Sequence, residues 1–585
     1  MFLITTANQK FWKKEGRILF LGEWCKLYKE RDIWSMLDHE TLPFIWKNRS
    51  RQAQSLGYIN KLYERFLKVI AIHLNEIHQT EYGKRYWRII IGPWLFYFLI
   101  FLYDRYLSIR SAIDSGKATN TWIIQKPDLP WVPKDYTTFN HWSIRHDDYN
   151  LYIYSQLIET LGGLPYETKN EALNMSQGQY DPPLRGVNYC LKAFMHKVNQ
   201  IIPCQYKEIV FVHSYFHYID LFRLQISLKQ APALFSPLPL IPAVSPDTSL
   251  REKLQLPASD SEFEKLAAML IPEQIPTAYL ESYKETHQKS LEYYPENPKL
   301  ILTANDLFGS EGFKFWAAHY VSKGCKLAGI QHGGGYGSRL IDSNAYNEIR
   351  ACDRYYTWGW SFKGSKKTQP LASGKLTGQE KIKPNPLGKI LSLSTGEPRY
   401  SRWDHGDQMG SEMDQYCREQ ARFFHSLSPE VQSNFVFRLH PADVDWDTES
   451  RLYELAPNIN IYRGKKNLRE QLKQSRLCIC TNNSTTLLET LSSNFPTLIF
   501  WNPKRCAIRK NAMPYYDALK KAGIYHETPE SAALQANEIF DDPWRWWTSE
   551  KVQNAIQKFC GRFAITNSRW IHDWKRELLD ICSKQ

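Results

Sequence analysis

The segment RLCICTNNSTTLLETLSSNFPTLIFW, residues 476–501, places two short apolar runs around a segment with helical spacing. RLCICT and TLIFW are typical of buried strands, and Cys478 and Cys480 alternate as small core residues would. Between them, Leu487, Leu488 and Leu491 recur as residues on one face of a helix do. A strand, a helix and a second strand in this order predict one unit of a parallel sheet.

The same alternation extends toward the amino terminus in two stretches. From about residue 298, KLILTAND, GFKFWAAHYVSKG, CKLAGIQHGG and ACDRYYTWGW are typical of a strand, a helix and two further strands. After a polar connector, residues 361–388, the pattern returns in KILSLST, SEMDQYCREQARFFHSL and NFVFRLHP. We therefore predict an α/β protein with two Rossmann-like, doubly wound domains facing a cleft, and with extra helices in the amino half. The expected bounds are 1–360 for the first domain and 389–585 for the second, whose last helices cross back.

Composition and charge limit the classes of partner. The chain has 585 residues, a net charge of +13 and an isoelectric point near 9.0. The excess favours anionic partners, but the basic residues are scattered among acids rather than gathered in an arm, which argues against nucleic acid. We expect anionic substrates and peripheral contact with an anionic inner-membrane face. Cysteines without framework spacing indicate a reducing compartment, so a cytoplasmic location is expected.

One apolar segment, RIIIGPWLFYFLIFLYDRYL at residues 88–107, raises the question of a membrane span. Its apolar part is about 15 residues long, which is shorter than the ~20 residues that a span needs. Gly92 and Pro93 are typical of a helix start, where proline is tolerated in the first turn. We predict a helix whose residues 94–103 are buried inside the protein.

Polar residues follow several of the predicted strands, at the ends where open α/β sheets bind ligands. These strand-end residues are Glu23, His213, Asp306, His332, His440 and the 481–486 run. In that run a helix is predicted to start near Ser484, and free N–H groups at a helix start bind phosphate. Thr485 and Thr486 would add hydroxyl donors. The alternative is a structural capping box formed by Thr486 and Glu489.

The segment KLAGIQHGGGYGSRLIDS, residues 326–343, places Gln331 and His332 after a strand and then four glycines within five residues. It matches neither GxGxxG nor a P-loop. Either the loop approaches a ligand with the imidazole aimed at it, or it is a tight turn with an incidental histidine.

Signals for a metal are weak. HSYFH spaces His213 and His217 as if on one helix face, but it lacks the glutamate of HExxH and a third ligand. DVDWDTESRLYE, beginning at Asp443, resembles a calcium loop but has Thr448 where glycine is required. We expect neither a metal nor a cofactor.

Taken in order, the motifs resemble a bacterial family of O-antigen and surface-carbohydrate biosynthesis transferases. The motifs that carry this resemblance are LITTA, LFLGEWC, YWRIIIGPWL with YDR, DDYN, VHSYF, KFWAAHYVSKGCKLAGIQHGGGYG, CDRYYTWGW, FRLHP and NNSTTLLETL. More distantly, the carboxy half is similar to GT-B glycosyltransferases with an HP motif. These include Kdo transferases, bacterial sialyltransferases and polymer glycerophosphotransferases.

The resemblance implies a role for each matching residue. The donor phosphate, commonly of a CMP-sugar, would be held by the FRLHP motif and the helix start, with Glu489 near the ribose or sugar. The residues concerned are Arg438, His440, Pro441, Ser484, Thr485 and Thr486. On the acceptor side of the cleft the resemblance and the strand-end rule place Gln331, Gly333, Gly334, His213 and Asp306. As the base that deprotonates the acceptor, the candidates are His332 and Glu23.

The sequence therefore predicts a metal-independent GT-B glycosyltransferase of O-antigen or capsule synthesis. It would transfer a sugar from a nucleotide-activated donor, with CMP-linked sugars among the candidates, to a glycan or lipid-linked acceptor. Two alternatives stay open: a nucleotide-sugar epimerase of the same architecture, and a non-catalytic glycan-binding or scaffold protein.

Overall fold

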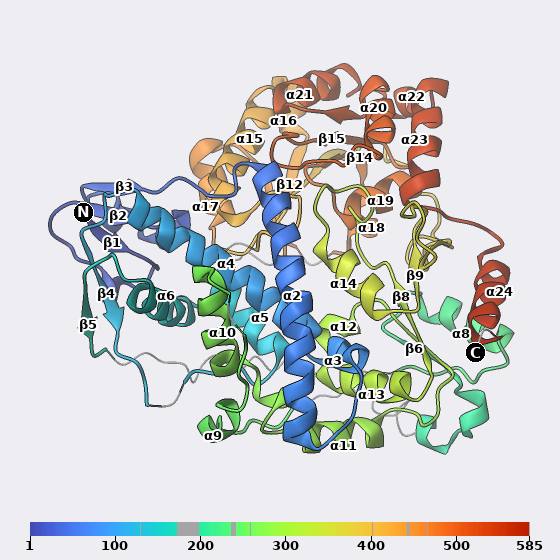
Figure 1. The fold of residues 1–585 in the computed structure, drawn as a ribbon. Coiled ribbons are helices and arrows are strands. Elements are labelled where there is room, and N and C mark those ends of the chain that lie inside the picture. The colour runs from blue at the N-terminus through green and yellow to red at the C-terminus, as the bar shows by residue number, and fades with distance from the viewer. Residues whose placement is uncertain are drawn as a thin grey trace. The chain divides into compact units, whose positions relative to one another are not determined.

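The computed structural model describes residues 1–583 except 129, 172–197, 236–240, 258, 401, 442–444 and 465. Within it the chain forms two compact units. Unit 1 consists of Met1–Ile330, Asn347–Asp353 and Lys575–Gln585, and unit 2 consists of Gln331–Tyr346 and Arg354–Trp574. The bounds differ from the expected break at residues 361–388, because the glycine-rich segment belongs to unit 2. Figure 1 follows the chain from its blue amino terminus to its red carboxyl terminus.

Unit 1 opens with a five-stranded parallel sheet in the order β3-β2-β1-β4-β5. Its strands are β1 (Phe2–Ile4), β2 (Ile18–Phe20), β3 (His39–Thr41), β4 (Asn120–Ile124) and β5 (Tyr166–Lys169). Phe2 lies opposite Ile18 of β2 on one side and Asn120 of β4 on the other. The predicted Rossmann-like domain within residues 1–360 was based on the strands after residue 298, and this additional sheet at the start of the chain was not predicted.

A second set of strands in unit 1 carries two of the predicted site residues. It consists of β6 (Ile209–Val212), β7 (Leu300–Thr303) and β8 (Lys326–Ile330), which run parallel in the order β8-β7-β6. All four residues of β6 and all four of β7 are buried. Because both strands are fixed in the core, the residues that follow them have defined positions.

The long helices of unit 1 are α2 (Arg49–His78), α3 (Lys84–Ile90) and α4 (Gly92–Asp114), and α2 packs along α4. As predicted, α4 begins at Gly92 with proline in its first turn, and every residue from 94 to 102 is buried. Among the described residues no single helix has the length and apolar content of a membrane span, and only α3 and α4 together, bent by 65°, reach them. The predicted burial is confirmed for residues 94–102, whereas Tyr103, the last residue of the predicted segment, is half-buried.

Shorter helices complete unit 1. They are α1 (Arg31–Trp34), α5 (Tyr136–Arg145), α6 (Asp147–Leu161), α8 (Tyr218–Ser227), α9 (Thr248–Arg251), α10 (Glu262–Gln274), α11 (Tyr283–Tyr293), α12 (Asp306–Gly309) and α13 (Glu311–Ser322). Two more, α14 (Ser343–Ala351) and α24 (Trp570–Ser583), cross the bounds of the units.

Unit 2 contains a six-stranded sheet in the order β13-β12-β11-β14-β15-β16, with every pair parallel. Its strands are β11 (Lys389–Leu393), β12 (Phe435–Arg438), β13 (Ile461–Tyr462), β14 (Ser475–Cys480), β15 (Thr497–Phe500) and β16 (Tyr525–His526). Numbered from β11, this is the order 3-2-1-4-5-6 of dinucleotide-binding sheets. The prediction of a doubly wound α/β fold is therefore confirmed. A short parallel pair, β9 (Arg354–Thr357) with β10 (Thr368–Pro370), also belongs to unit 2.

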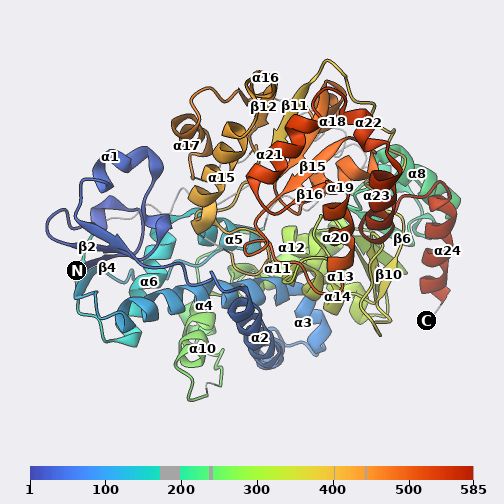
Figure 2. The same cartoon turned by 90° about the horizontal axis from the view of Figure 1, so that it is seen from above.

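Helices cover both faces of this sheet. They are α15 (Met413–His425), α16 (Pro429–Ser433), α17 (Thr448–Leu455), α18 (Leu468–Lys473), α19 (Thr485–Ser492), α20 (Met513–Lys521), α21 (Pro529–Glu538), α22 (Pro543–Trp547) and α23 (Glu550–Phe563). Figure 2 shows β15 between α21 and α19, and both helices contact it. One core cluster joins α15 and α21 to alternate residues of the strands, among them Phe435, Phe437 and Leu498.

Candidate functional site

A cavity of about 540 Å³ lies in unit 2, beyond the carboxyl ends of β11, β12 and β13. It is lined by Ser394, Thr395, Gly396, Glu397, Met413, Arg438, Leu439, His440, Pro441, Trp446, Thr448, Glu449, Tyr462, Arg463 and Gly464. Three residues of the predicted donor site, Arg438, His440 and Pro441, are therefore in its wall. The position agrees with the rule that open α/β sheets bind ligands beyond the carboxyl ends of their strands.

Hydrogen bonds from Arg438 and His440 fix the end of β12 in place. The Arg438 guanidinium donates to the Lys466 carbonyl at 3.0 Å and to the side-chain oxygen of Gln471, which lies within α18. The backbone N–H of His440 donates to the hydroxyl of Ser394 after β11. Since the backbone of His440 is anchored while the residue is exposed, its imidazole is presented at the cavity rather than packed in the core.

Sequence reasoning missed the cavity residues that follow β11, Ser394 to Glu397. The same strand-end rule that selected His440 applies to KILSLST, so a usable signal was present. Thr395 is fixed by two bonds, from its N–H to the Tyr416 hydroxyl at 3.1 Å and from the Asn482 amide to its own hydroxyl at 2.9 Å. These bonds connect the wall of the cavity to the loop between β14 and α19.

Glu397 is a residue of the cavity wall whose carboxyl has a strongly shifted pKa. Burial raises the pKa of its carboxyl well above the usual range, and the nearby Asp407 carboxylate raises it further. Its Oε2 lies 3.8 Å from Nε2 of His405, and burial lowers the pKa of that imidazole. Both shifts favour the uncharged forms, a protonated Glu397 beside a neutral His405. A protonated carboxyl would donate a hydrogen bond where a carboxylate would repel a phosphate.

Replacing Glu397 by glutamine should make the protein more stable, by an amount that grows with pH. The folded state raises this pKa, so the associated stability is complete below the ordinary glutamate range and is lost as pH rises through the raised value. Glu397→Gln removes that loss. We expect its gain in melting temperature over the wild type to be larger at pH 8.5 than at pH 5.5. A gain that does not change with pH would contradict the assignment.

The start of α19 differs from the capping box considered above. The helix begins at Thr485 with Ser484 as its N-cap, and no side-chain capping bond is present there. Glu489 lies in the second turn and pairs with Lys375 at 2.9 Å. The structural alternative built on Thr486 and Glu489 is therefore wrong.

The glycine loop packs directly on this helix start, and both elements belong to unit 2. The Gly334 N–H donates to Oγ1 of Thr485 at 2.9 Å. A Cβ on Gly334 would lie 2.1 Å from the carbonyl carbon of Ser484 and 2.4 Å from the backbone nitrogen of Thr485. Gly333 is also close, because a Cβ there would lie 3.7 Å from the Thr485 hydroxyl. The close approach that requires glycine at position 334 is to protein backbone, whereas a Cβ at position 333 would meet only side-chain atoms.

Gln331 and His332 differ in the environment of their side chains. Gln331 is buried: its amide oxygen accepts from the Trp358 N–H at 2.9 Å and from the Trp360 indole at 2.8 Å. Nε2 of the half-buried His332 lies 2.8 Å from the hydroxyl of Tyr336, four residues along the same loop. Gln331 therefore fixes the loop, and the His332 ring is held by Tyr336.

The residues predicted to hold one phosphate lie on opposite sides of β11. β12 and β14 both pair with β11, so the loops that carry His440 and Ser484 are separated by two strand spacings, roughly 9–10 Å in backbone. Among the described residues that line the cavity, none belongs to the Ser484–Thr486 run. Within unit 2 the residues predicted to bind the donor phosphate therefore lie in two neighbouring loops, one after β12 and one after β14.

The remaining predicted residues belong to unit 1. Glu23 follows β2 in a short 3-10 helix, and its carboxylate pairs with the ammonium of Lys26 at 3.1 Å. His213 follows β6 and contacts Asp306 at 2.8 Å. Because α8 begins only at Tyr218, with His217 as its N-cap, the expectation that His213 and His217 share a helix face is wrong.

Metal ligands were considered at two places in the sequence. Among the described residues, no group of three or more His, Cys, Asp or Glu side chains is arranged to hold an ion. Asp443, in the calcium-like spacing, lies outside the described residues.

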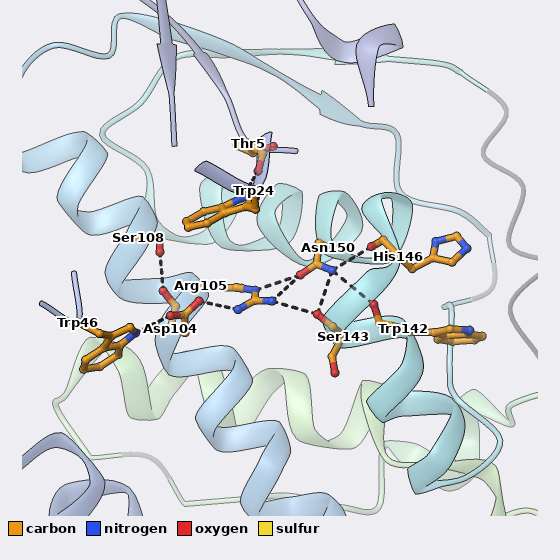
Figure 3. Close-up of polar contacts among 10 residues, drawn as sticks. All are labelled: Thr5, Trp24, Trp46, Asp104, Arg105, Ser108, Trp142, Ser143, His146 and Asn150. Carbon is orange, nitrogen blue, oxygen red and sulfur yellow. Dashed lines mark hydrogen bonds and ion pairs between the residues drawn. The ribbon is translucent and has the colours of Figure 1, made fainter. Parts of the chain in front are cut away.

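Two of the motifs singled out in the sequence, YDR and DDYN, meet in a buried cluster of unit 1 (Figure 3). Arg105 donates to Asp104 at 2.5 Å, to the amide oxygen of Asn150 at 3.0 and 2.9 Å, and to the Ser143 carbonyl at 3.0 Å. The Trp46 indole donates to the other oxygen of Asp104 at 2.6 Å. The partners named here all lie inside unit 1, and these bonds connect helices α4, α5 and α6.

Similarities to solved structures are weak. A UDP-GlcNAc 2-epimerase from Neisseria meningitidis is 10% identical, with 63% of this chain and 89% of that chain covered and a TM-score of 0.33. MurG from Acinetobacter baumannii is 10% identical over 68% and 97% of the two chains, with a TM-score of 0.31. WaaG, a glycosyltransferase involved in lipopolysaccharide biosynthesis, is 12% identical over 64% and 100%, with a TM-score of 0.27. Similarities of this size decide nothing about activity.

The family comparison is of a different kind. Curated proteins give no match to the sequence. The model of the LIC12162 family, described as transferases, matches residues 1–578 and so extends over both compact units. The chain belongs to the LIC12162 family of transferases.

Proposed function

We propose that this transferase moves a sugar from a nucleotide-activated donor to a glycan or lipid-linked glycan in the synthesis of a bacterial surface polysaccharide. The observation that carries the proposal is the cavity beyond β11, β12 and β13. Its volume of about 540 Å³ suits a nucleotide, since small-molecule sites are usually about 300–1,000 Å³. Its position at the carboxyl ends of a sheet in dinucleotide-binding order supports the same class of ligand.

The lining supplies the groups that a phosphate ester needs. Arg438 and His440 are nitrogen donors, Ser394 and Thr395 add hydroxyls, and the raised pKa of Glu397 favours its protonated form, which can also donate. In sugar transfer the bond between the anomeric carbon and the phosphate oxygen breaks, and charge collects on the phosphate. Donors fixed before the reaction stabilise that charge without reorganising.

Thermal-shift measurements with CMP, UDP, GDP and dTDP test the proposal directly, and CMP is the first candidate because of the HP-motif resemblance. A nucleotide present at about 100 times its dissociation constant adds roughly 2.7 kcal/mol of apparent stability. With the matching nucleotide sugar, a transferase releases free nucleotide, whereas an epimerase returns an isomerised nucleotide sugar. If none of the four nucleotides stabilised the protein, the proposal would fail.

His440→Ala should weaken nucleotide binding roughly 10- to 100-fold. Losing one charge-assisted donor costs about 1.5–3 kcal/mol, and ~1.4 kcal/mol corresponds to a factor of ten. Calorimetric titration with the nucleotide found above measures the change. His425→Ala is the matched control, because His425 lies on α15 and its Nε2 is 2.8 Å from the Leu455 carbonyl, outside the cavity. Equal binding by the two variants would remove His440 from the donor site.

A further inference from the structure

We infer that unit 2 contains a carbohydrate-binding site, separate from the donor cavity, which takes a sugar with an acidic group. The site is a cavity of about 630 Å³ beside β16, an edge strand of the six-stranded sheet. This volume is within the range of about 300–1,000 Å³ that is usual for small-molecule sites. The inference goes beyond the proposed function, because it concerns binding at a different place and needs neither the donor nor the reaction.

The cavity beside β16 and the donor cavity have no lining residue in common, and both are within unit 2. β16 is separated from β11 by β14 and β15. Three strand spacings, roughly 14 Å, therefore lie between the two strands. A sugar bound beside β16 does not occupy the place proposed for the nucleotide.

Four parts of unit 2 form the wall of this cavity. They are the end of α20, β16 with the residues around it, α21, and α22 with the start of α23. α20 and α21 both contact β16, and α22 contacts α23. The buried His526 lies among them, with its Nδ1 2.8 Å from the Ser531 hydroxyl and its Nε2 3.0 Å from the Gly523 carbonyl. Because both ring nitrogens have protein partners, His526 supports the wall and leaves the ligand contacts to its neighbours.

Trp546 of α22 supplies an aromatic surface in the wall. Its side chain is half-buried and packs against the core cluster of unit 2, and its ring centroid lies 5.4 Å from that of the fully buried Trp547. The indole therefore has a fixed position while it lines the cavity. Such a ring suits a pyranose, whose C–H groups can pack against the electron-rich face of an indole.

Hydrogen-bonding groups without protein partners lie beside this ring. A Cβ on Gly523 would lie 2.9 Å from Oε1 of Gln535 and 3.8 Å from Nε1 of Trp546, so the amide and the indole edge are close together. Among the described residues, neither these two side chains nor the carboxylate of Glu538 has a hydrogen-bond partner. Each sugar hydroxyl both donates and accepts, and an amide, an indole N–H and a carboxylate together meet both needs.

The charges of the lining favour an acidic sugar. Lys520 and Glu527 pair with each other at 2.7 Å. The other charged residues are Lys521, Lys551 and Glu538, and among the described residues neither of these two lysines forms an ion pair. Two positive charges against one negative charge suit a ligand with a single carboxylate. A ligand with several phosphate charges would also meet the carboxylate of Glu538, which repels it.

The main test is a titration of the full chain with small sugars, followed by saturation-transfer NMR. The acidic probes are the methyl glycosides of glucuronic acid, galacturonic acid and N-acetylneuraminic acid, and the controls are methyl glucoside and acetate. At least one acidic sugar should bind roughly 2- to 30-fold more tightly than methyl glucoside, as expected for two exposed lysines. If none of the acidic sugars bound, or if acetate alone bound as tightly, the inference would be wrong.

Variants locate the binding. Trp546→Ala should weaken binding of the acidic sugar by at least about 30-fold, because a large aromatic contact is lost. Trp544→Ala is the matched control, since Trp544 lies on the same helix, is 39% exposed and does not line the cavity. The double variant Lys521→Gln with Lys551→Gln changes only exposed positions and should weaken binding roughly 2- to 30-fold. Equal binding by the two tryptophan variants, or wild-type binding by the double lysine variant, would overturn the inference.

Nucleotide measurements separate this inference from the proposed function. A saturating nucleotide should leave the acidic sugar bound, and displacement of the sugar would show that the two cavities are not independent sites, which would overturn the inference. Binding of an acidic sugar by a protein that no nucleotide stabilises would count against the proposed function and support this inference. Stabilisation by a nucleotide without binding of any acidic sugar would do the reverse.

Discussion

Arg105→Met should lower the free energy of unfolding by about 3–5 kcal/mol, because it leaves the Asp104 carboxylate buried without its cationic partner. Both side chains are almost inaccessible, at 2% and 6% exposure. The variant also removes the bonds to Asn150 and to the Ser143 carbonyl, which connect α4 to α5 and α6. Urea or thermal unfolding of the purified protein measures the loss.

The chain supplies a matched control on the same helix. Arg110 is 33% exposed and pairs with Asp114 at 3.1 Å, one turn away, and with Glu262 at 3.7 Å. Arg110→Met should cost no more than about 1 kcal/mol, since exposed ion pairs contribute little. The double variant Asp104→Leu with Arg105→Met should be more stable than Arg105→Met alone, because it leaves no unpaired charge. If Arg105→Met and Arg110→Met lowered the free energy of unfolding equally, the buried cluster around Arg105 would not be what holds α4, α5 and α6 together.

The central strands of unit 2, β11, β12, β14 and β15, could be predicted from sequence because their cores are continuous apolar runs, whereas β10 and β16 were not predicted. Cys478 and Cys480, for example, are both buried in β14 as the pattern indicated. The edge strands β3 and β5 carry no such signal. The residues of β3 are half-buried, and three of the four in β5 are exposed. They are strands because β2 and β4 offer a partner, which is a property of the assembled sheet.

The candidate site was predictable to the extent that strand ends are visible in sequence. That rule identified His440, and it would have identified Glu397 had it been applied to the end of β11. It could not indicate that the pKa of Glu397 is raised, since the burial and the Asp407 neighbour both arise from tertiary packing. Nor could it show that His213 and Asp306, separated by 93 residues, share a hydrogen bond.

The reason for the glycines after His332 also depends on a distant segment. Gly334 and Thr485 are 151 residues apart, yet a hydrogen bond joins them. From the local sequence alone, the glycines were explained either by the close approach of a ligand or by a tight turn. The structure shows that the residue opposite Gly334 is the N-cap of α19, so the sequence requirement arises from the contact between two loops of unit 2.

Gly334→Ala tests that contact and should destabilise unit 2 by about 3 kcal/mol, the upper end of the usual cost of overpacking. The added Cβ would lie 2.1–2.4 Å from three backbone atoms of Ser484 and Thr485, none of which can rotate away as a side chain would. The loop must move, and the hydrogen bond from the Gly334 N–H to Thr485 is lost with it. Thermal unfolding should show the loss, and limited proteolysis should show faster cleavage near residue 334.

Gly561→Ala is the matched control, with an expected effect of opposite sign. Gly561 lies in the last turn of α23, and a Cβ there would meet nothing within 4 Å. Alanine should stabilise the helix by up to about 0.5–1 kcal/mol because glycine loses more backbone entropy on folding. If Gly334→Ala were as stable as Gly561→Ala, the loop would not contact the start of α19. The orientation of His332 would then have to be reconsidered, because its ring is carried by the same loop.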